Sequence, residues 1–263
     1  MPDGSMSTDL YHEVRGQGPA VLFIPGAFGD AGQFAGPAER LADEFTVITY
    51  DRRGFSRSRQ GSDRPDSASV SAQADDAARL ITVSGVDRAM VFGTSFGANI
   101  VLDLVARHPE VVTAAIVHEP PLRELLPPID LPNPTGPVIQ LARTDPSAAV
   151  EAMIRTMGSD EGWEAIEPAT RARISANGEY FFGREFGTFS GYVPDTAAIR
   201  ATGVPVQLLL SAHGGPMAPP VIAILAERLG APIATISGSH MPFGEAPTLF
   251  ADELRPILER LAA

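Results

Sequence analysis

The sequence predicts an α/β fold in which a mostly parallel, twisted β-sheet is flanked by helices. Short apolar runs rich in β-branched residues alternate with longer segments of helical periodicity, which is typical of βαβ units. Most of the apolar runs are continuously hydrophobic or nearly so, as expected for parallel strands that are buried on both faces. A chain of 263 residues is long enough for one such domain with an insertion.

The clearest apolar runs are predicted as the parallel strands. They are Ala20–Ile24, Thr46–Tyr50, Ala89–Phe92, Ala114–Val117, Val206–Leu210 and Ile233–Ile236. The more polar run Leu10–Val14 fits an antiparallel strand at the sheet edge. Helical patterns between these runs are predicted at Gln33–Asp43, Ala68–Ser84, Gly97–Arg107, Pro219–Leu229 and Thr248–Leu261.

Residues 120–200 break this alternation. The segment opens with a proline-dense passage, continues with helical patterns at Ser147–Gly158 and Gly162–Asn177, and ends in a stretch rich in aromatic residues. We therefore expect a helical lid (120–200) inserted into a core domain formed by residues 1–119 and 201–263. The aromatic residues either pack between lid and core or line an apolar pocket, in which Phe181 and Phe182 are candidate substrate contacts.

Composition argues against several classes of protein. The net charge is −12, and the cluster from Arg52 to Arg59 is too short for a nucleic-acid site, so we interpret it as a solvated loop. The absence of cysteine removes disulfides, thiolate catalysis and cysteine-ligated zinc. No apolar run approaches the roughly 18 residues of a membrane span, and no signal peptide is visible. We expect a cytoplasmic protein with no membrane or nucleic-acid partner, and the sequence leaves open whether it forms a homodimer.

The segment Gly93–Gly97 (Gly-Thr-Ser-Phe-Gly) predicts a nucleophile. It follows the strand at Ala89–Phe92 and opens the next helix. A serine on such a sharp strand-to-helix turn has a strained and crowded backbone, so the flanking positions need glycine. The turn places the Ser95 hydroxyl at a helix N-terminus, where developing negative charge is favoured.

A serine nucleophile needs a base, and His240 is the best candidate among the five histidines. It lies in a Gly-Ser-His-Met-Pro segment between the last predicted strand and the last helix, which is the place of the base in the chain order serine, acid, histidine. Met241, next to it, is a candidate substrate contact. His12 and His108 are interpreted as structural, and His213 is kept as a candidate pocket residue.

The acid does not stand at its usual place. The residues after Val206–Leu210 contain no Asp or Glu, whereas the preceding core strand leads into Glu119. Because parallel strands end at the same edge of a sheet, a carboxylate there can reach the far ring nitrogen of His240. Asp195 and Asp51 are the weaker alternatives.

Two backbone amides are expected to bind the oxyanion: that of Phe96, after the nucleophile, and that of Ala27, in the glycine-rich loop after the first parallel strand. Phe28, in the same loop, is a candidate substrate contact. The loop reads G-x-x-G-x-x-G and not the dinucleotide pattern. Asp51, at the end of the next strand, nevertheless lies at about the distance expected of a ribose-binding acid, so a nicotinamide oxidoreductase is a rival interpretation. That interpretation leaves Ser95, Glu119 and His240 unexplained.

Together these segments resemble the α/β-hydrolase superfamily over nearly the whole chain. The resemblance rests on Ile24–Phe28, Tyr50–Ser56, the turn at Ser95 and Gly238–His240. A closer similarity is to the zearalenone lactonase group, which hydrolyses a macrocyclic resorcylic acid lactone. It rests on chain length and on His118–Pro121, Glu161–Glu164 and His240–Phe243.

By this resemblance Ser95, Glu119 and His240 form the triad, and Ala27 and Phe96 form the oxyanion hole. The chain departs from the family at Pro25, where His commonly precedes Gly26, and near Phe181, where the lactonases carry a lid tryptophan. We expect a hydrolase that needs no cofactor or metal and acts on a small-molecule ester or lactone. A cofactor-free haloperoxidase or acyltransferase and a non-hydrolytic ligand-binding protein are the alternatives.

Overall fold

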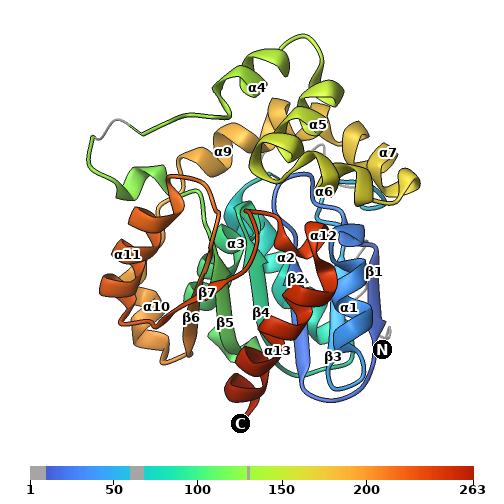
Figure 1. Cartoon of the computed structure of the whole chain (residues 1–263). Helices are drawn as coiled ribbons and strands as arrows, with labels where there is room; N and C mark the ends of the chain where they lie inside the picture. The colour runs from blue at the N-terminus through green and yellow to red at the C-terminus, as the bar shows by residue number, and fades with distance from the viewer. Residues whose placement is uncertain (1–9, 60–67, 129–130) are drawn as a thin grey trace, which may run out of the picture.

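A computed structural model describes residues 10–59, 68–128 and 131–263 and contains one seven-stranded sheet. The strand order is β1-β3-β2-β4-β5-β6-β7, and every pairing is parallel except that of β1 with β3 (Figure 1). The strands are β1 (His12–Arg15), β2 (Ala20–Ile24), β3 (Thr46–Tyr50), β4 (Ala89–Thr94), β5 (Val112–His118), β6 (Val206–Ser211) and β7 (Ile233–Ile236). The predicted fold class and the antiparallel edge strand are confirmed.

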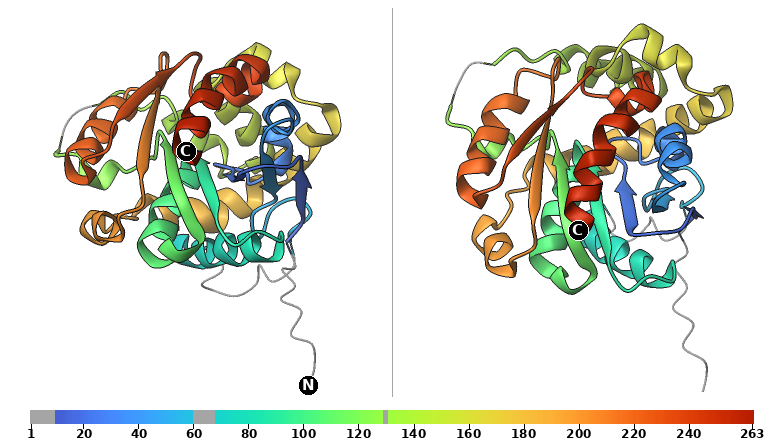
Figure 2. Two further views of the ribbon diagram at one scale, coloured as in Figure 1. Left: turned by 90° about the horizontal axis from the view of Figure 1, so that it is seen from below. Right: turned by 60° about the horizontal axis from the view of Figure 1, so that its bottom comes forward.

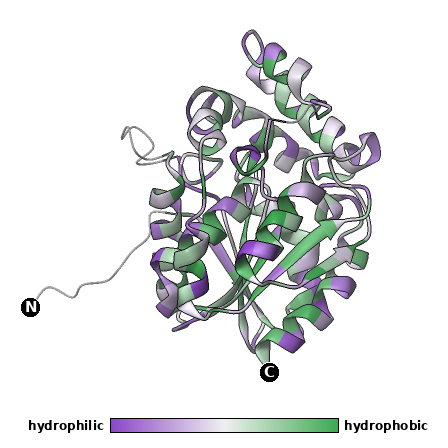
Figure 3. Cartoon of the chain, turned by 90° about the vertical axis from the view of Figure 1, so that its left-hand side faces the viewer, coloured by the Kyte–Doolittle hydropathy of each residue, from purple (hydrophilic) through white to green (hydrophobic). Residues whose placement is uncertain are grey.

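Helices cover both faces of the sheet. On one face lie α1 (Ala35–Leu41) and α13 (Pro247–Ala262), which contact each other. On the other face lie α2 (Val70–Val83), α3 (Phe96–Arg107), α10 (Thr196–Thr202) and α11 (Ala218–Leu229). The views in Figure 2 show α13 and α1 on the same side, and Figure 3 shows apolar residues following the strands between the two layers.

Between β5 and β6 the described residues form helices and no strand. The 3₁₀ turn η2 (Pro109–Val111) precedes β5, and α10, already placed on the sheet face, comes last before β6. Between β5 and α10 follow the 3₁₀ turn η3 (Arg123–Leu125) and the helices α4 (Gly136–Leu141), α5 (Pro146–Met157), α6 (Asp160–Ala165), α7 (Pro168–Ala176), α8 (Gly178–Tyr180), the π-helix η4 (Phe181–Glu185) and α9 (Phe186–Ser190). In Figure 1 they lie beyond the end of the sheet at which β4 leads into α3. This places a helical segment over the carboxyl edge of the strands.

Two predicted helices are each divided in the structure. The helix expected over 162–177 is broken because Pro168 begins α7, with Glu167 as the N-cap accepting from the amides of Ala169 and Thr170. A residue before proline is disfavoured in the helical region, whereas proline itself fits the first turn. Similarly, the helix expected over 33–43 comprises a 3₁₀ turn, η1 (Ala31–Phe34), followed by α1. In the described residues, no helix has the length and apolar character required to span a bilayer.

The expectation that Arg52–Arg59 is a solvated loop is wrong for Arg52. Its side chain is fully buried and pairs with Glu185, while Arg57 pairs with Asp51. A buried guanidinium is tolerated when its charge is compensated, and here both terminal nitrogens bond residues far apart in the sequence, which no local pattern reveals. The Nε atom of Arg52 has no hydrogen-bond partner among the described residues.

Candidate active site

Ser95 occupies a strained turn between β4 and α3. Its backbone lies at φ 53° and ψ −124°, a conformation that side-chain-bearing residues rarely adopt. The turn is crowded: a Cβ at Gly93 would meet the carbonyl oxygen of Gly97 at 2.4 Å, and one at Gly97 would meet that of Ile24 at 2.3 Å. The Ser95 amide donates to the His118 carbonyl at 2.9 Å, which fixes the turn to the end of β5.

Glu119 and His240 are joined by a hydrogen bond. The Nδ1 atom of His240 lies 2.5 Å from Oε2 of Glu119, and Oε1 accepts from the Ser211 amide at 2.8 Å. Glu119 is buried and has φ 46°, so it leaves β5 by a bend that turns its side chain toward the His240 loop. A carboxylate on Nδ1 leaves Nε2 as the ring atom able to accept a proton.

Gly214 explains why the acid is absent after β6. A Cβ at Gly214 would lie 2.1 Å from Oε1 of Glu119 and 2.8 Å from its Cδ. The Glu119 carboxylate therefore occupies the space that any side chain at position 214 would enter.

The charge state of this cluster follows from its contacts. Burial alone would raise the pKa of Glu119, but the hydrogen bond from His240, the rings of His118 and His240 and the Ser211 amide together lower it. Burial lowers the pKa of His118 to about 4, so this ring is neutral near pH 7. His118 bonds Thr94 Oγ1 at 2.8 Å and Ser211 Oγ at 2.9 Å, and its ring stacks on that of His240. The neutral His118 ring thus links the end of β4 to the end of β6 through these two hydrogen bonds.

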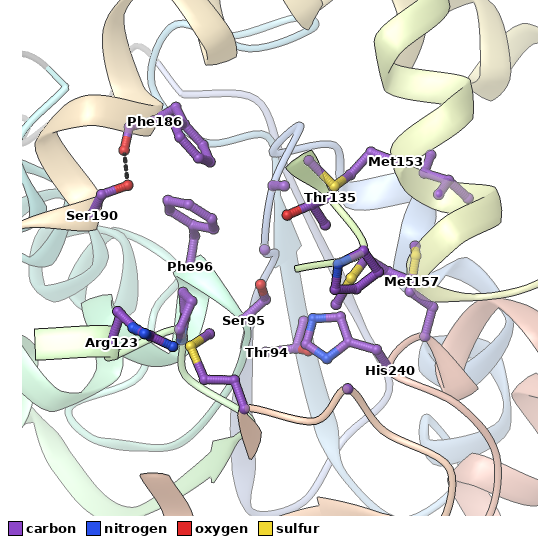
Figure 4. Close-up of a pocket in the computed structure, with 18 of the residues that line it drawn as sticks. Thr94, Ser95, Phe96, Arg123, Thr135, Met153, Met157, Phe186, Ser190 and His240 are labelled. Carbon is purple, nitrogen blue, oxygen red and sulfur yellow. Dashed lines mark hydrogen bonds between the residues drawn. The ribbon is translucent and has the colours of Figure 1, made fainter. Parts of the chain in front are cut away.

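Ser95 and His240 line the same cavity, and Figure 4 shows both at its base. The structure contains no hydrogen bond between the Ser95 hydroxyl and the His240 ring. Contacts of this kind are often long in a ligand-free site and tighten when the substrate is bound.

The predicted oxyanion amides also face this cavity region. Both Ala27 and Phe96 line it, and neither backbone N–H donates a hydrogen bond to any described residue. Buried or half-buried backbone donors are normally paired, so two open donors beside Ser95 form a ready site for an oxygen bearing negative charge.

The cavity measures about 570 Å³ and is mostly apolar. Of the candidate substrate contacts, Phe28, Phe181 and Met241 line it. Phe182 does not; it packs against Phe28 and Phe181.

Residues of α5 that the sequence reading missed line the opposite wall from Phe96 and Phe186 (Figure 4). They are Met153, Ile154 and Met157, which share one helix face. Their spacing on an amphipathic helix was a signal, but it marks a buried face without saying whether a core or a cavity lies beneath it.

The remaining candidates have structural partners. Asp51 accepts from the Ala31 amide at 2.8 Å and pairs with Arg57, so its carboxylate organises its own loop and is not free for a ribose. Asp195 caps α10 by accepting from the Ala198 amide. His213 is exposed and lies outside the cavity lining. Among the described residues no group of three or more His, Asp or Glu side chains is arranged to hold a metal ion.

Comparison with known proteins identifies the family of the fold. Residues 19–145 match the family described as the alpha/beta hydrolase fold. The chain is 33% identical over 259 residues to the uncharacterized hydrolase YraK of Bacillus subtilis, covering 96% of this chain and 93% of that protein. It is 29% identical over 248 residues to a zearalenone hydrolase of Cladophialophora bantiana, covering 92% of this chain and 89% of the relative.

Among solved structures, a thermophilic esterase from Thermogutta terrifontis superposes with a TM-score of 0.76 at 23% identity. The match covers 97% of this chain and 94% of the esterase, and it shows a shared fold.

Proposed function

The chain belongs to the α/β-hydrolase family, and on that premise we propose that it is a carboxylic ester hydrolase with Ser95 as its nucleophile. The observation that carries the proposal is the hydrogen bond between Glu119 and His240, made at the base of a cavity that Ser95 also lines. Nucleophile, base and acid thus come from the ends of β4, β7 and β5 and meet at one edge of the sheet.

The reaction proceeds through an acyl-enzyme. Nε2 of His240 takes the proton of Ser95 as Oγ attacks the ester carbonyl carbon, and the Ala27 and Phe96 amides hold the resulting oxyanion. The C–O bond of the ester then breaks, and His240 returns the proton to the leaving alcohol. A water molecule repeats the sequence on the acyl-enzyme, which releases the acid and restores Ser95. Glu119 holds the His240 ring and stabilises its charged form throughout.

We infer further that the preferred ester is a lactone. The helical segment 120–200 acts as a lid in this proposal, because α5, η4 and α9 all supply residues to the cavity lining. The cavity volume of about 570 Å³ exceeds what a short linear ester needs and suits a macrocyclic substrate. The similarity to proteins named zearalenone hydrolase supports this choice.

Labelling with a fluorophosphonate probe tests the nucleophile. Wild type should be labelled and should hydrolyse p-nitrophenyl acetate, whereas Ser95→Ala should lose both properties because it lacks the proposed nucleophilic hydroxyl. Ser190→Ala removes the other serine of the described cavity lining and should still be labelled. Persistent labelling of Ser95→Ala would contradict the assignment.

A direct substrate comparison tests the lactone preference. Product formation from a resorcylic macrolactone and from linear p-nitrophenyl esters of increasing length is measured with the same enzyme preparation. We expect a higher kcat/KM for the macrolactone. A preference for short linear esters would leave the serine chemistry in place and remove the lactone proposal.

A further inference from the structure

Arg52 is a buried cation that the proposed reaction does not use directly. It is fully buried, and its Nη2 atom donates to the Gly26 carbonyl at 2.7 Å. Its Nη1 atom donates to Gln73 Oε1 at 2.7 Å, and both nitrogens pair with the Glu185 carboxylate. Gln73 also donates to Glu185 at 2.7 Å. This network joins the loop after β3, α2 and the π-helix η4 to one carbonyl group.

The bonded carbonyl belongs to the same peptide unit as the Ala27 amide. In a planar trans peptide the C=O and the N–H point in opposite directions. A guanidinium that holds the Gly26 oxygen therefore fixes the direction of the Ala27 N–H. The Gly29 amide also donates to this oxygen, at 3.3 Å, but that contact is long and within the loop itself.

We propose that Arg52 is a positioning residue that keeps the Ala27 amide aimed into the cavity as an oxyanion donor, and that Glu185 of the lid holds Arg52 in place. The inference rests on the proposed function, because it requires an oxyanion at this position. If the Gly26–Ala27 peptide rotated, the carbonyl oxygen would replace the donor and repel the developing charge. Losing one oxyanion donor typically lowers kcat by about 10²–10³-fold.

A second contact from the lid supports this view. Asn177, at the end of α7, donates to the Phe28 carbonyl at 2.7 Å and accepts from the Ser56 amide at 2.9 Å. Phe28 has φ 69°, so the loop after β2 has a conformation that needs outside support. The lid thus contacts the loop after β2 directly at the Phe28 carbonyl and, through Glu185 and Arg52, indirectly at the Gly26 carbonyl. These two carbonyls lie on either side of Ala27.

The test replaces the whole polar network at once. The triple variant Arg52→Met, Gln73→Leu and Glu185→Leu leaves no buried charge without its partner, and such replacements are often neutral for stability. Thermal unfolding confirms that the variant is folded. We expect its rate of labelling by the fluorophosphonate probe and its kcat to fall by about 10²–10³-fold, with KM changed by less than about threefold.

The matched control removes a different ion pair between lid and core. Arg173 of α7 pairs with buried Asp30, directly after the oxyanion loop, and neither residue contacts Gly26. Arg173→Met with Asp30→Asn should keep the wild-type labelling rate. If the triple variant does not fold, Arg52→Lys serves instead: its single nitrogen cannot occupy both guanidinium positions, so labelling should slow by about tenfold or more.

The outcomes separate the two proposals. If wild type is not labelled at Ser95, the proposed function fails, whatever the variants do. If wild type is labelled at Ser95 and the triple variant (or Arg52→Lys in its place) is labelled at the wild-type rate, only the positioning role of Arg52 is overturned. A parallel fall in the Arg173 and Asp30 control would likewise overturn it, because the effect would then belong to the lid in general.

Discussion

Adding one methyl group at Gly214 should disable the proposed triad while leaving its three members unchanged. The Cβ of Gly214→Ala would lie 2.1 Å from Glu119 Oε1, so the carboxylate must move by about 1 Å to restore an ordinary contact. It cannot do so and keep both its hydrogen bond to the Ser211 amide and its 2.5 Å contact with His240. A displacement of about 1 Å in a catalytic arrangement costs about 10²-fold.

The assay is kcat/KM for p-nitrophenyl acetate, with Glu119→Gln as the benchmark for complete loss of the acid. Gly214 has an ordinary backbone conformation, so alanine should not unfold the chain there, and thermal unfolding checks this. Gly244→Ala, in α12 (Pro242–Glu245) just after the His240 loop, is the matched control, because its added Cβ would meet nothing within 4 Å. The reasoning is refuted if Gly214→Ala retains kcat/KM within about threefold of wild type.

Three further outcomes are expected. Glu119→Ala should lower kcat/KM by about 10⁴-fold. Adding Gly214→Asp should recover at least tenfold of that loss, since the new Cβ would lie 2.1 Å from the position of Glu119 Oε1 and a carboxylate on it could reach His240; no recovery would contradict this. Folded His118 has its pKa lowered from 6.5 to about 4, so the unfolded chain binds the extra proton between these values. The free energy of unfolding should therefore fall by about 1.4 kcal/mol per pH unit as the pH drops through this window. Urea titrations at several pH values measure this dependence, and His118→Gln should weaken it. An unchanged pH dependence in His118→Gln would contradict the prediction. Met157→Trp should raise KM for a macrolactone more than for p-nitrophenyl acetate, and equal effects would contradict the cavity assignment.

The core of the fold and the positions of the candidate triad could be predicted because parallel strands have a common edge. In the structure Thr94 pairs with His118 across β4 and β5, so the next residues, Ser95 and Glu119, leave the sheet at the same level. The sequence contains both strand ends and the glycines of the turn. The proximity of Ser95 and Glu119 therefore follows from the pairing of parallel strands.

The helical segment 120–200, the proposed lid, could not be predicted to the same depth. Its helices have no sheet register to fix their rotation, and several are short, so the aromatic stretch gave no basis for separating Phe181, which lines the cavity, from Phe182, which does not. The pairing of Arg52 with Glu185 spans 133 residues and leaves no periodic signal. In the sequence, Arg52 and Glu185 are simply charged residues in segments that could equally face solvent.

The position of Glu119 has a consequence for how this enzyme could change its substrate. Where the acid follows the penultimate strand, the loop after that strand must keep one side chain in register with the histidine. Here the loop after β6 does not carry the proposed acid, and its residues Gly215, Pro216 and Met217 form part of the cavity wall instead. Beyond the glycine at 214, this stretch is therefore open to substitution and length change without displacing the acid. Substitutions in this stretch can therefore change which substrates fit the cavity while the proposed catalytic residues keep their positions.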